Sequence, residues 1–194
     1  MFDDVNGFAQ RYVQDWTEWI AAPTCARPHL FGEILRKWQA TRPHAMRRLR
    51  IHAQHRPPFL DDLLCQSAAC ITAVGDLEVL RINNRTGPQT HAFSELWQIF
   101  RRLPVSGNAS CVGISKAILL LTDGRIGPAF ESQVRKKLRI TAPTTCTAWF
   151  AALEEVADDI KAFEAVHGPL NCAVPKKFAH LSYGRLYDMA LGPR

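Results

Sequence analysis

The chain has 194 residues, of which 47% are hydrophobic and 22% are charged. This size and composition are typical of one globular domain, and they exclude a large multidomain assembly. No apolar run approaches the roughly 20 residues that a membrane-spanning helix needs. The N-terminal Met-Phe-Asp-Asp-Val sequence is acidic, whereas an export signal begins with basic residues and continues with apolar ones. We therefore expect a cytoplasmic protein that does not contact a membrane.

The charge balance favours a polyanionic partner. The 24 Lys and Arg residues exceed the 18 Asp and Glu residues, which gives a formal net charge of +6. Clustered cations gain affinity for nucleic acids when they displace counterions from the phosphates. The six cysteines form no C-x-x-C pair and no Cys/His cluster with zinc spacing. We therefore expect reduced cysteines, no metal site and no cofactor.

Apolar residues at helical spacing predict a series of helices in the first part of the chain. The first covers residues 4–21, with Pro23 after it, and the second covers residues 29–41. Residues 43–56 predict a third helix with a thin apolar face, because five arginines fall within residues 42–56. The charged side of this basic segment faces either water or phosphate. Two prolines end it, and residues 59–73 predict an amphipathic helix.

Residues 75–89 break the helical pattern and predict a loop. Within it, residues 77–82 alternate weakly and are compatible with a short strand. Helical periodicity then returns over residues 93–100, 110–122, 128–138, 145–166 and 181–191. The sequence thus predicts an all-α compact bundle of about eight to nine helices, with at most one short hairpin or strand. We expect one domain over residues 1–194, either undivided or in two lobes with a cleft near residues 103–139.

The segment over residues 103–139 contains the side chains best suited to chemistry. Gly113 comes shortly before Ser115 and Lys116 at the beginning of an apolar helix. Free backbone N–H groups and the helix dipole can hold a phosphate at such a place. The alternative is that Gly113 only permits a tight turn, which Ser110 caps.

A second turn in this segment leads to an acidic residue. Residues 123–127 precede Pro128, which suits the first position of a helix and so places Glu131 in the first helical turn. There the carboxylate either complements the helix dipole or, if it faces a pocket, takes part in chemistry. The cationic run over residues 135–139 faces either solvent or a polyanion.

This segment resembles the helix-hairpin-helix superfamily of DNA glycosylases. The shared features are Leu103-Pro104, then Val112-Gly113 leading through Ser115-Lys116-Ala117 into an apolar helix, and finally Pro128 with an acidic residue after it. The sequence SKAILLLTDGRIGPAFESQVRKKL is also similar to a group of bacterial relatives. Those relatives carry Ser-Lys, then Pro and an Asp-Ser pair.

The sequence differs from the superfamily pattern at three positions. Cys111 stands where the first hairpin glycine is expected, and Glu131 comes three residues after Pro128, whereas the better known members carry Asp two residues after it. Lys116 lies one place beyond the Schiff-base lysine of the members that also cleave the DNA strand. The resemblance therefore implies a monofunctional enzyme.

The resemblance also implies roles for individual residues. Such an enzyme flips a base out of double-stranded DNA and hydrolyses its N-glycosidic bond. Glu131 would stabilise the positive charge that develops on the deoxyribose, with Asp123 as the reserve candidate. Trp38 and Trp97 are candidates for stacking on the flipped base, although both also fit core packing. The candidate DNA-binding residues are Gly113, Ile114, Ser115, Lys116, Arg125, Arg135 and Lys136, together with Arg47, Arg48 and Arg50 of the basic segment.

We thus expect a monomeric DNA glycosylase without a cofactor, which excises a damaged or modified base and leaves an abasic site. Its setting is either DNA repair or antiviral defence against phages whose DNA carries hypermodified cytosines. Two alternatives stay open: a non-catalytic helix-hairpin-helix module that binds DNA, and an all-α interaction domain whose basic face is incidental. Salt-dependent affinity for duplex DNA separates the last from the other two.

Overall fold

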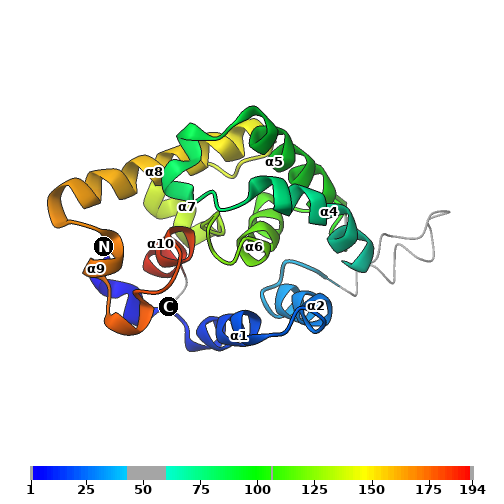
Figure 1. Ribbon diagram of the computed structural model, residues 1–194, viewed down its shortest axis with the longest axis horizontal. Coiled ribbons are helices and arrows are strands. Elements are labelled where there is room, and N and C mark those ends of the chain that lie inside the picture. Colours follow the sequence, from blue (N-terminus) through cyan, green and yellow to red (C-terminus); the bar gives the residue numbers. More distant parts are fainter. Residues whose placement is uncertain (1, 43–59, 106, 193–194) are drawn as a thin grey trace.

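The computed structural model describes residues 2–42, 60–105 and 107–192, and every regular element in these ranges is helical (Figure 1). The prediction of an all-α protein is confirmed, and eight of the described α-helices have seven or more residues. The α-helices are α1 (Gln10–Ala21), α2 (Arg27–Lys37), α4 (Leu60–Val74), α5 (Gly87–Phe100), α6 (Cys111–Leu121), α7 (Ser132–Leu138), α8 (Cys146–His167), α9 (Leu170–Ala173) and α10 (Tyr183–Leu191). Three 3₁₀ helices accompany them: η1 (Phe2–Gly7), η2 (Val79–Asn84) and η3 (Lys176–Phe178). The helix predicted over residues 43–56, with Arg47, Arg48 and Arg50, lies outside the described residues.

Two central helices carry much of the core. Nine of the eleven residues of α6 and eight of the nine residues of α10 are buried, as expected for helices that are covered on all sides. Figure 1 shows α1 and α2 along one side of this centre and α4, α5 and α8 along the other. Lys116 of α6 and Arg185 of α10 are both buried. The fold therefore places two cations inside the protein, where each needs a partner.

The N-terminal helix is shorter than predicted. Residues 4–21 divide into η1 and α1, because the backbone at Ala9 is extended, with φ −59° and ψ 120°. Gly7 lies at this break, and glycine is the least favourable helix residue after proline. The predicted apolar stripe is nevertheless buried, and it consists of Phe8, Tyr12, Trp16 and Trp19.

The short strand with which residues 77–82 were compatible does not form, because this segment leads into the 3₁₀ helix η2. Val79 and Ile82 are fully buried and lie three residues apart, a spacing that places both side chains on one side of a 3₁₀ helix. The Val79 amide also donates a hydrogen bond to the Arg125 carbonyl at 2.9 Å. Helix α5 begins six residues before its predicted start because Thr86 and Gln89 form a capping box.

Three glycines allow the turn after α6 to touch α10. The Arg185 amide donates a hydrogen bond to the Gly124 carbonyl at 2.9 Å. A Cβ atom added to Gly184 would lie 2.6 Å from the Gly127 amide nitrogen and 2.7 Å from the Gly124 carbonyl oxygen. Both neighbours are backbone atoms and cannot rotate away. This contact therefore requires glycine at position 184.

We expect Gly184→Ala to lower the free energy of unfolding by about 1–3 kcal/mol, because the added methyl group overpacks a backbone contact. Thermal unfolding followed by circular dichroism measures this loss. Gly87→Ala is the matched control, since a Cβ atom there meets no atom within 4 Å and alanine favours a helix. Equal melting temperatures for the two variants would contradict the close packing of Gly184.

Candidate functional site

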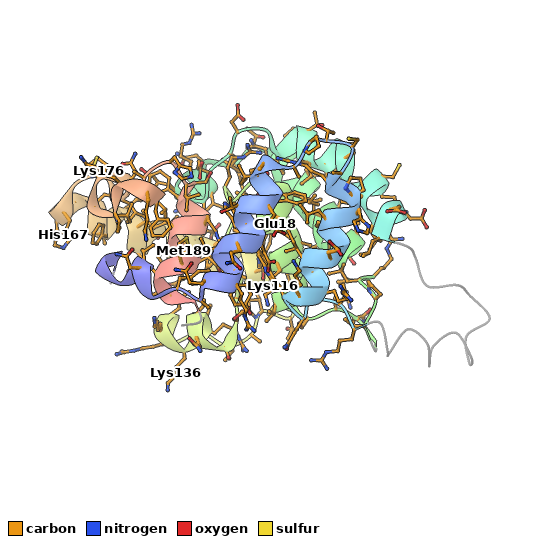
Figure 2. The ribbon with its side chains drawn as sticks, turned by 90° about the horizontal axis from the view of Figure 1, so that it is seen from below. Glu18, Lys116, Lys136, His167, Lys176 and Met189 are labelled. Atoms are coloured by element: carbon orange, nitrogen blue, oxygen red, sulfur yellow. The ribbon has the colours of Figure 1, made fainter. Side chains whose placement is uncertain are left out.

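Lys116 and Glu131 form an ion pair between α6 and the residue that precedes α7. Lys116 Nζ lies 2.5 Å from Glu131 Oε1 and donates a hydrogen bond to the Trp38 carbonyl oxygen at 2.6 Å. Figure 2 looks onto α1 and α2 and shows Lys116 between them. The Lys116 side chain is 7% exposed, whereas the Glu131 side chain is 21% exposed. The protein therefore fixes the carboxylate from the inside and leaves part of it open to solvent.

Ser115, next to Lys116, also contacts the segment that precedes α7, through a hydrogen bond to a backbone amide. Its hydroxyl accepts a hydrogen bond from the Phe130 amide at 3.2 Å and donates one to the Cys111 carbonyl at 2.6 Å. The Ser115-Lys116 pair on α6 thus contacts two consecutive residues, Phe130 and Glu131. The beginning of α6 and the segment before α7 therefore lie against each other.

Helix α7 begins later than predicted because these contacts hold the preceding residues. The Ala129 amide donates to Asp188 Oδ1 at 3.0 Å, and the next amide donates to Ser115. The expected helix start at Pro128 is therefore wrong, and α7 begins at Ser132. Glu131 occupies the N-cap position, with an extended backbone, rather than the first helical turn.

Asp188 is itself paired inside the protein. Arg185 Nη1 lies 2.7 Å from Asp188 Oδ2, and Arg185 Nη2 donates to the Tyr12 carbonyl at 3.1 Å. Burial raises the pKa of the Asp188 carboxyl, the Arg185 charge opposes this rise, and the Glu131 charge adds to it. The buried polar network thus contains Lys116 and Glu131 at one end and Arg185 and Asp188 at the other.

Aromatic rings surround the Arg185 guanidinium. Its central carbon lies 4.6 Å from the Trp16 ring centroid, 4.9 Å from that of Phe8 and 5.7 Å from that of Trp38. Rings at these distances stabilise a desolvated cation. The sequence analysis missed Arg185 and Asp188. The available signal was an Arg and an Asp three residues apart in a helix that is otherwise mostly apolar.

The two tryptophans predicted for base stacking lie in the core. Trp38 is 2% exposed, and its Nε1 donates to Asp15 Oδ2 at 2.8 Å. Trp97 is also 2% exposed, and its ring centroid lies 5.8 Å from that of Trp149. The structure therefore places both rings in the core packing that was the alternative interpretation.

Gly113 lies in the first turn of α6, next to the chain that follows α2. A Cβ atom at Gly113 would lie 3.3 Å from the Ala40 carbonyl oxygen. The neighbouring Arg42 amide donates to the Pro104 carbonyl at 2.9 Å, so residues 38–42 run from Lys116 to the turn before α6. Both Gly113 and Ile114 are buried, and the Ile114 amide already donates to Ser110.

Asp123 stabilises a turn. Its backbone has a φ of 47°, and its Oδ1 atom accepts hydrogen bonds from Trp19 Nε1 at 3.0 Å and from Arg27 at 3.2 Å. These partners belong to α1 and α2. Asp123 is therefore joined to α1 and α2, whereas Glu131 pairs with Lys116 of α6.

The predicted cationic residues differ in how far they are available to a ligand. Arg125 lies 3.8 Å from Asp76, and Arg135 Nε donates to the Phe130 carbonyl at 3.1 Å. Lys136 is exposed and projects outward from α7 (Figure 2). Of these three side chains, that of Lys136 is the most accessible to a phosphate.

A polar cavity that the sequence analysis did not predict lies beside the turn between α5 and α6. Its volume is about 700 Å³, and its lining includes Gln66, Glu95, Gln98, Arg101, Arg102 and Asn108. Arg102 contacts Gln66 Oε1. The available signal was the pair of arginines directly before Leu103-Pro104.

Within the described part of the chain, no group of three or more His, Cys, Asp or Glu side chains is placed to hold a metal ion. None of the helices in this part combines the length and the apolarity needed to cross a membrane. The chain matches no protein-family model, no curated protein and no solved structure.

Proposed function

We propose that this protein is a monofunctional DNA glycosylase that excises a damaged or modified base from double-stranded DNA and leaves an abasic site. It acts as a monomer in the cytoplasm and needs no cofactor. The observation that carries this proposal is the position of Glu131: a partly exposed carboxylate, held at the N-cap of α7 by a buried lysine. Cleavage of an N-glycosidic bond develops positive charge on the sugar, and a carboxylate that is already fixed stabilises this charge without reorganisation.

The surroundings of Lys116 favour hydrolysis over Schiff-base chemistry. An amine that attacks the sugar must be unprotonated and must reach the sugar carbon. Lys116 Nζ instead lies in an ion pair with Glu131 and donates to the Trp38 carbonyl. Lys116 thus acts as a positioning residue, and Glu131 orients or deprotonates the attacking water.

The exposed cations suit contact with the phosphate backbone. Arg42 and Arg102 are exposed, and the Arg42 amide donates to the Pro104 carbonyl in the turn before α6. Lys136 is exposed on α7, and the net charge of the chain is +6. Such cations give an attraction that does not depend on sequence and that weakens as the salt concentration rises.

A second candidate function is a DNA-binding module without catalytic activity. The pairing of Glu131 with Lys116 supports it, because a carboxylate that only neutralises a buried lysine has a structural role. In this candidate function the exposed cations bind DNA, and Glu131 does not hydrolyse the N-glycosidic bond.

The two candidates are separated by incubating the protein with duplexes that carry deaminated, alkylated, oxidised or sugar-bearing bases, and then with hot alkali. The glycosylase proposal predicts strand scission at the modified base in at least one duplex. Scission at a sugar-bearing cytosine assigns the enzyme to phage defence, and scission at a damaged base assigns it to repair. Salt-dependent binding without scission in any duplex supports the module, and the absence of binding at low salt overturns both.

A further inference from the structure

The segment that leads to Glu131 is held in place by side chains from two other helices. The Ala129 amide donates to Asp188 of α10 at 3.0 Å. The next amide, that of Phe130, donates to Ser115 of α6 at 3.2 Å. Ala129 and Phe130 are 3% and 0% exposed, so the side chains take the place of water as partners of these amides. The two contacts therefore fix the path of the backbone up to the residue that carries the carboxylate.

A second hydrogen bond orients the Ser115 hydroxyl toward the Phe130 amide. The hydroxyl donates its single proton to the Cys111 carbonyl, one turn earlier in α6, at 2.6 Å. A hydroxyl also accepts through the lone pairs of its oxygen, and here the oxygen accepts from Phe130. Ser115 is only 2% exposed. Both hydrogen-bonding functions of this buried hydroxyl are thus used inside the protein, and a phosphate of DNA cannot reach it.

Ser115 and Lys116 hold two different parts of the segment that carries the carboxylate. Ser115 contacts the backbone one residue before Glu131. Lys116 contacts the carboxylate itself, with 2.5 Å between its Nζ and Glu131 Oε1. Because a carboxylate held at one point can still turn about that point, the second contact is needed to fix its direction. Ser115 also differs from Lys116 in carrying no charge, so its replacement leaves no buried charge without a partner.

We propose that Ser115 is a positioning residue for base excision: by accepting from the Phe130 amide, it sets the direction in which the Glu131 carboxylate faces the sugar of the flipped nucleotide. This inference rests on the proposed glycosylase function. It gives Ser115 an effect on the rate of the reaction and none on the affinity for DNA. A small displacement matters to such a reaction, since moving a reacting group by about 1 Å can cost about 100-fold in rate.

Ser115→Ala is expected to lower the single-turnover rate of base excision by about tenfold on the duplex that wild type cleaves best. The substitution leaves the buried Phe130 amide without its acceptor, and an unpaired buried donor favours a shift of the segment. Affinity for the duplex is expected to stay within about twofold, because the exposed cations that attract phosphate are unchanged. A residue that contacted DNA would instead weaken binding when it is replaced.

Thr122→Val is the matched control, because Thr122 makes the same pair of hydrogen bonds at the other end of α6. Its hydroxyl donates to the Ile118 carbonyl at 2.7 Å and accepts from the Ile126 amide at 3.2 Å, and Thr122 is fully buried. Valine keeps the shape of threonine and removes the hydroxyl. This variant is expected to keep the excision rate within about twofold of wild type, because Ile126 lies outside the segment that Ser115 holds. Rates are compared at a temperature at which circular dichroism shows both variants to be folded.

Nuclear magnetic resonance spectra test the same contact without the reaction. In protein labelled at the side-chain carboxyl carbon of glutamate, the Glu131 signal is assigned by its loss in Glu131→Gln. It is expected to shift in Ser115→Ala and to keep its position in Thr122→Val. With an active wild type, an unchanged signal or an unchanged rate in Ser115→Ala, or an equal loss of rate in Thr122→Val, would overturn the role of Ser115 alone. A wild type that excises no base from any duplex would overturn the glycosylase proposal, and this role with it.

Discussion

Replacement of Arg185 with methionine is expected to lower the free energy of unfolding by about 3–5 kcal/mol, a large share of the ~5–15 kcal/mol that stabilises a typical domain. Arg185 and Asp188 are 1% and 6% exposed. The variant leaves the Asp188 carboxylate without its ionic partner and the Tyr12 carbonyl without one of its donors. Methionine is long, apolar and flexible, so it fills most of the space and the loss reports the missing charge.

Urea unfolding followed by tryptophan fluorescence measures this loss at neutral pH. The double variant Arg185→Met/Asp188→Asn is expected to be more stable than Arg185→Met, because asparagine leaves no buried charge without a partner and can still accept from the Ala129 amide. Arg36→Met is the control for the substitution itself, since Arg36 is exposed, and its effect is expected to stay within about 0.5 kcal/mol. A loss below about 1 kcal/mol in Arg185→Met, or a double variant less stable than that single variant, would show that the pair does not support the core.

The pH dependence of the Arg185→Met variant follows from the same pair. Burial already raises the pKa of Asp188, and Arg185 opposes that rise, so removal of Arg185 raises the pKa further. The folded variant then binds a proton more tightly than the unfolded chain, in which an Asp has a pKa of about 3.9. Its stability therefore falls as the pH rises from about 4 through the higher folded pKa. The stability difference between variant and wild type, measured by urea unfolding, should be smaller at pH 5 than at pH 8.

The helices could be predicted wherever one face is apolar and the other polar. The predicted helix over residues 145–166 differs from α8 by one residue at each end. The start of α7 could not be predicted, because Asp188 and Ser115, 59 and 15 residues away, hold the amides of residues 129 and 130. Local propensity is a weak guide where distant side chains take over the backbone hydrogen bonds.

Single residues of the candidate site could be predicted from the sequence, but the contacts between them could not. Lys116 and Glu131 were both singled out, yet only the fold shows that they form one ion pair. Lys116 was expected to contact phosphate at the beginning of an apolar helix, whereas the structure buries it in this ion pair. The roles of Trp38 and Gly113 depend on residues 38–42 running along α6. No spacing within the sequence contains that information.

Replacement of Glu131 with glutamine is expected to lower the rate of base excision by at least about 100-fold, the effect of removing one fixed electrostatic group from an active site. Glutamine has the same size and can still accept a hydrogen bond from Lys116, but it carries no charge to stabilise the sugar. The rate is measured in single turnovers, with protein in excess over the duplex that wild type cleaves best. Affinity for that duplex is expected to stay within about threefold, because salt-dependent binding depends on the exposed cations.

Two further variants distinguish lost chemistry from lost structure. Glu131→Gln leaves the Lys116 charge without its partner, so Lys116→Met/Glu131→Gln removes both charges and is expected to fold, to bind DNA and to lack excision. Asp123→Asn is the matched control: it neutralises the other candidate carboxylate, whose contacts are Trp19 and Arg27, and we expect it to keep the excision rate within a few-fold of wild type. Excision that persisted in Glu131→Gln but disappeared in Asp123→Asn would move the catalytic carboxylate to the turn after α6.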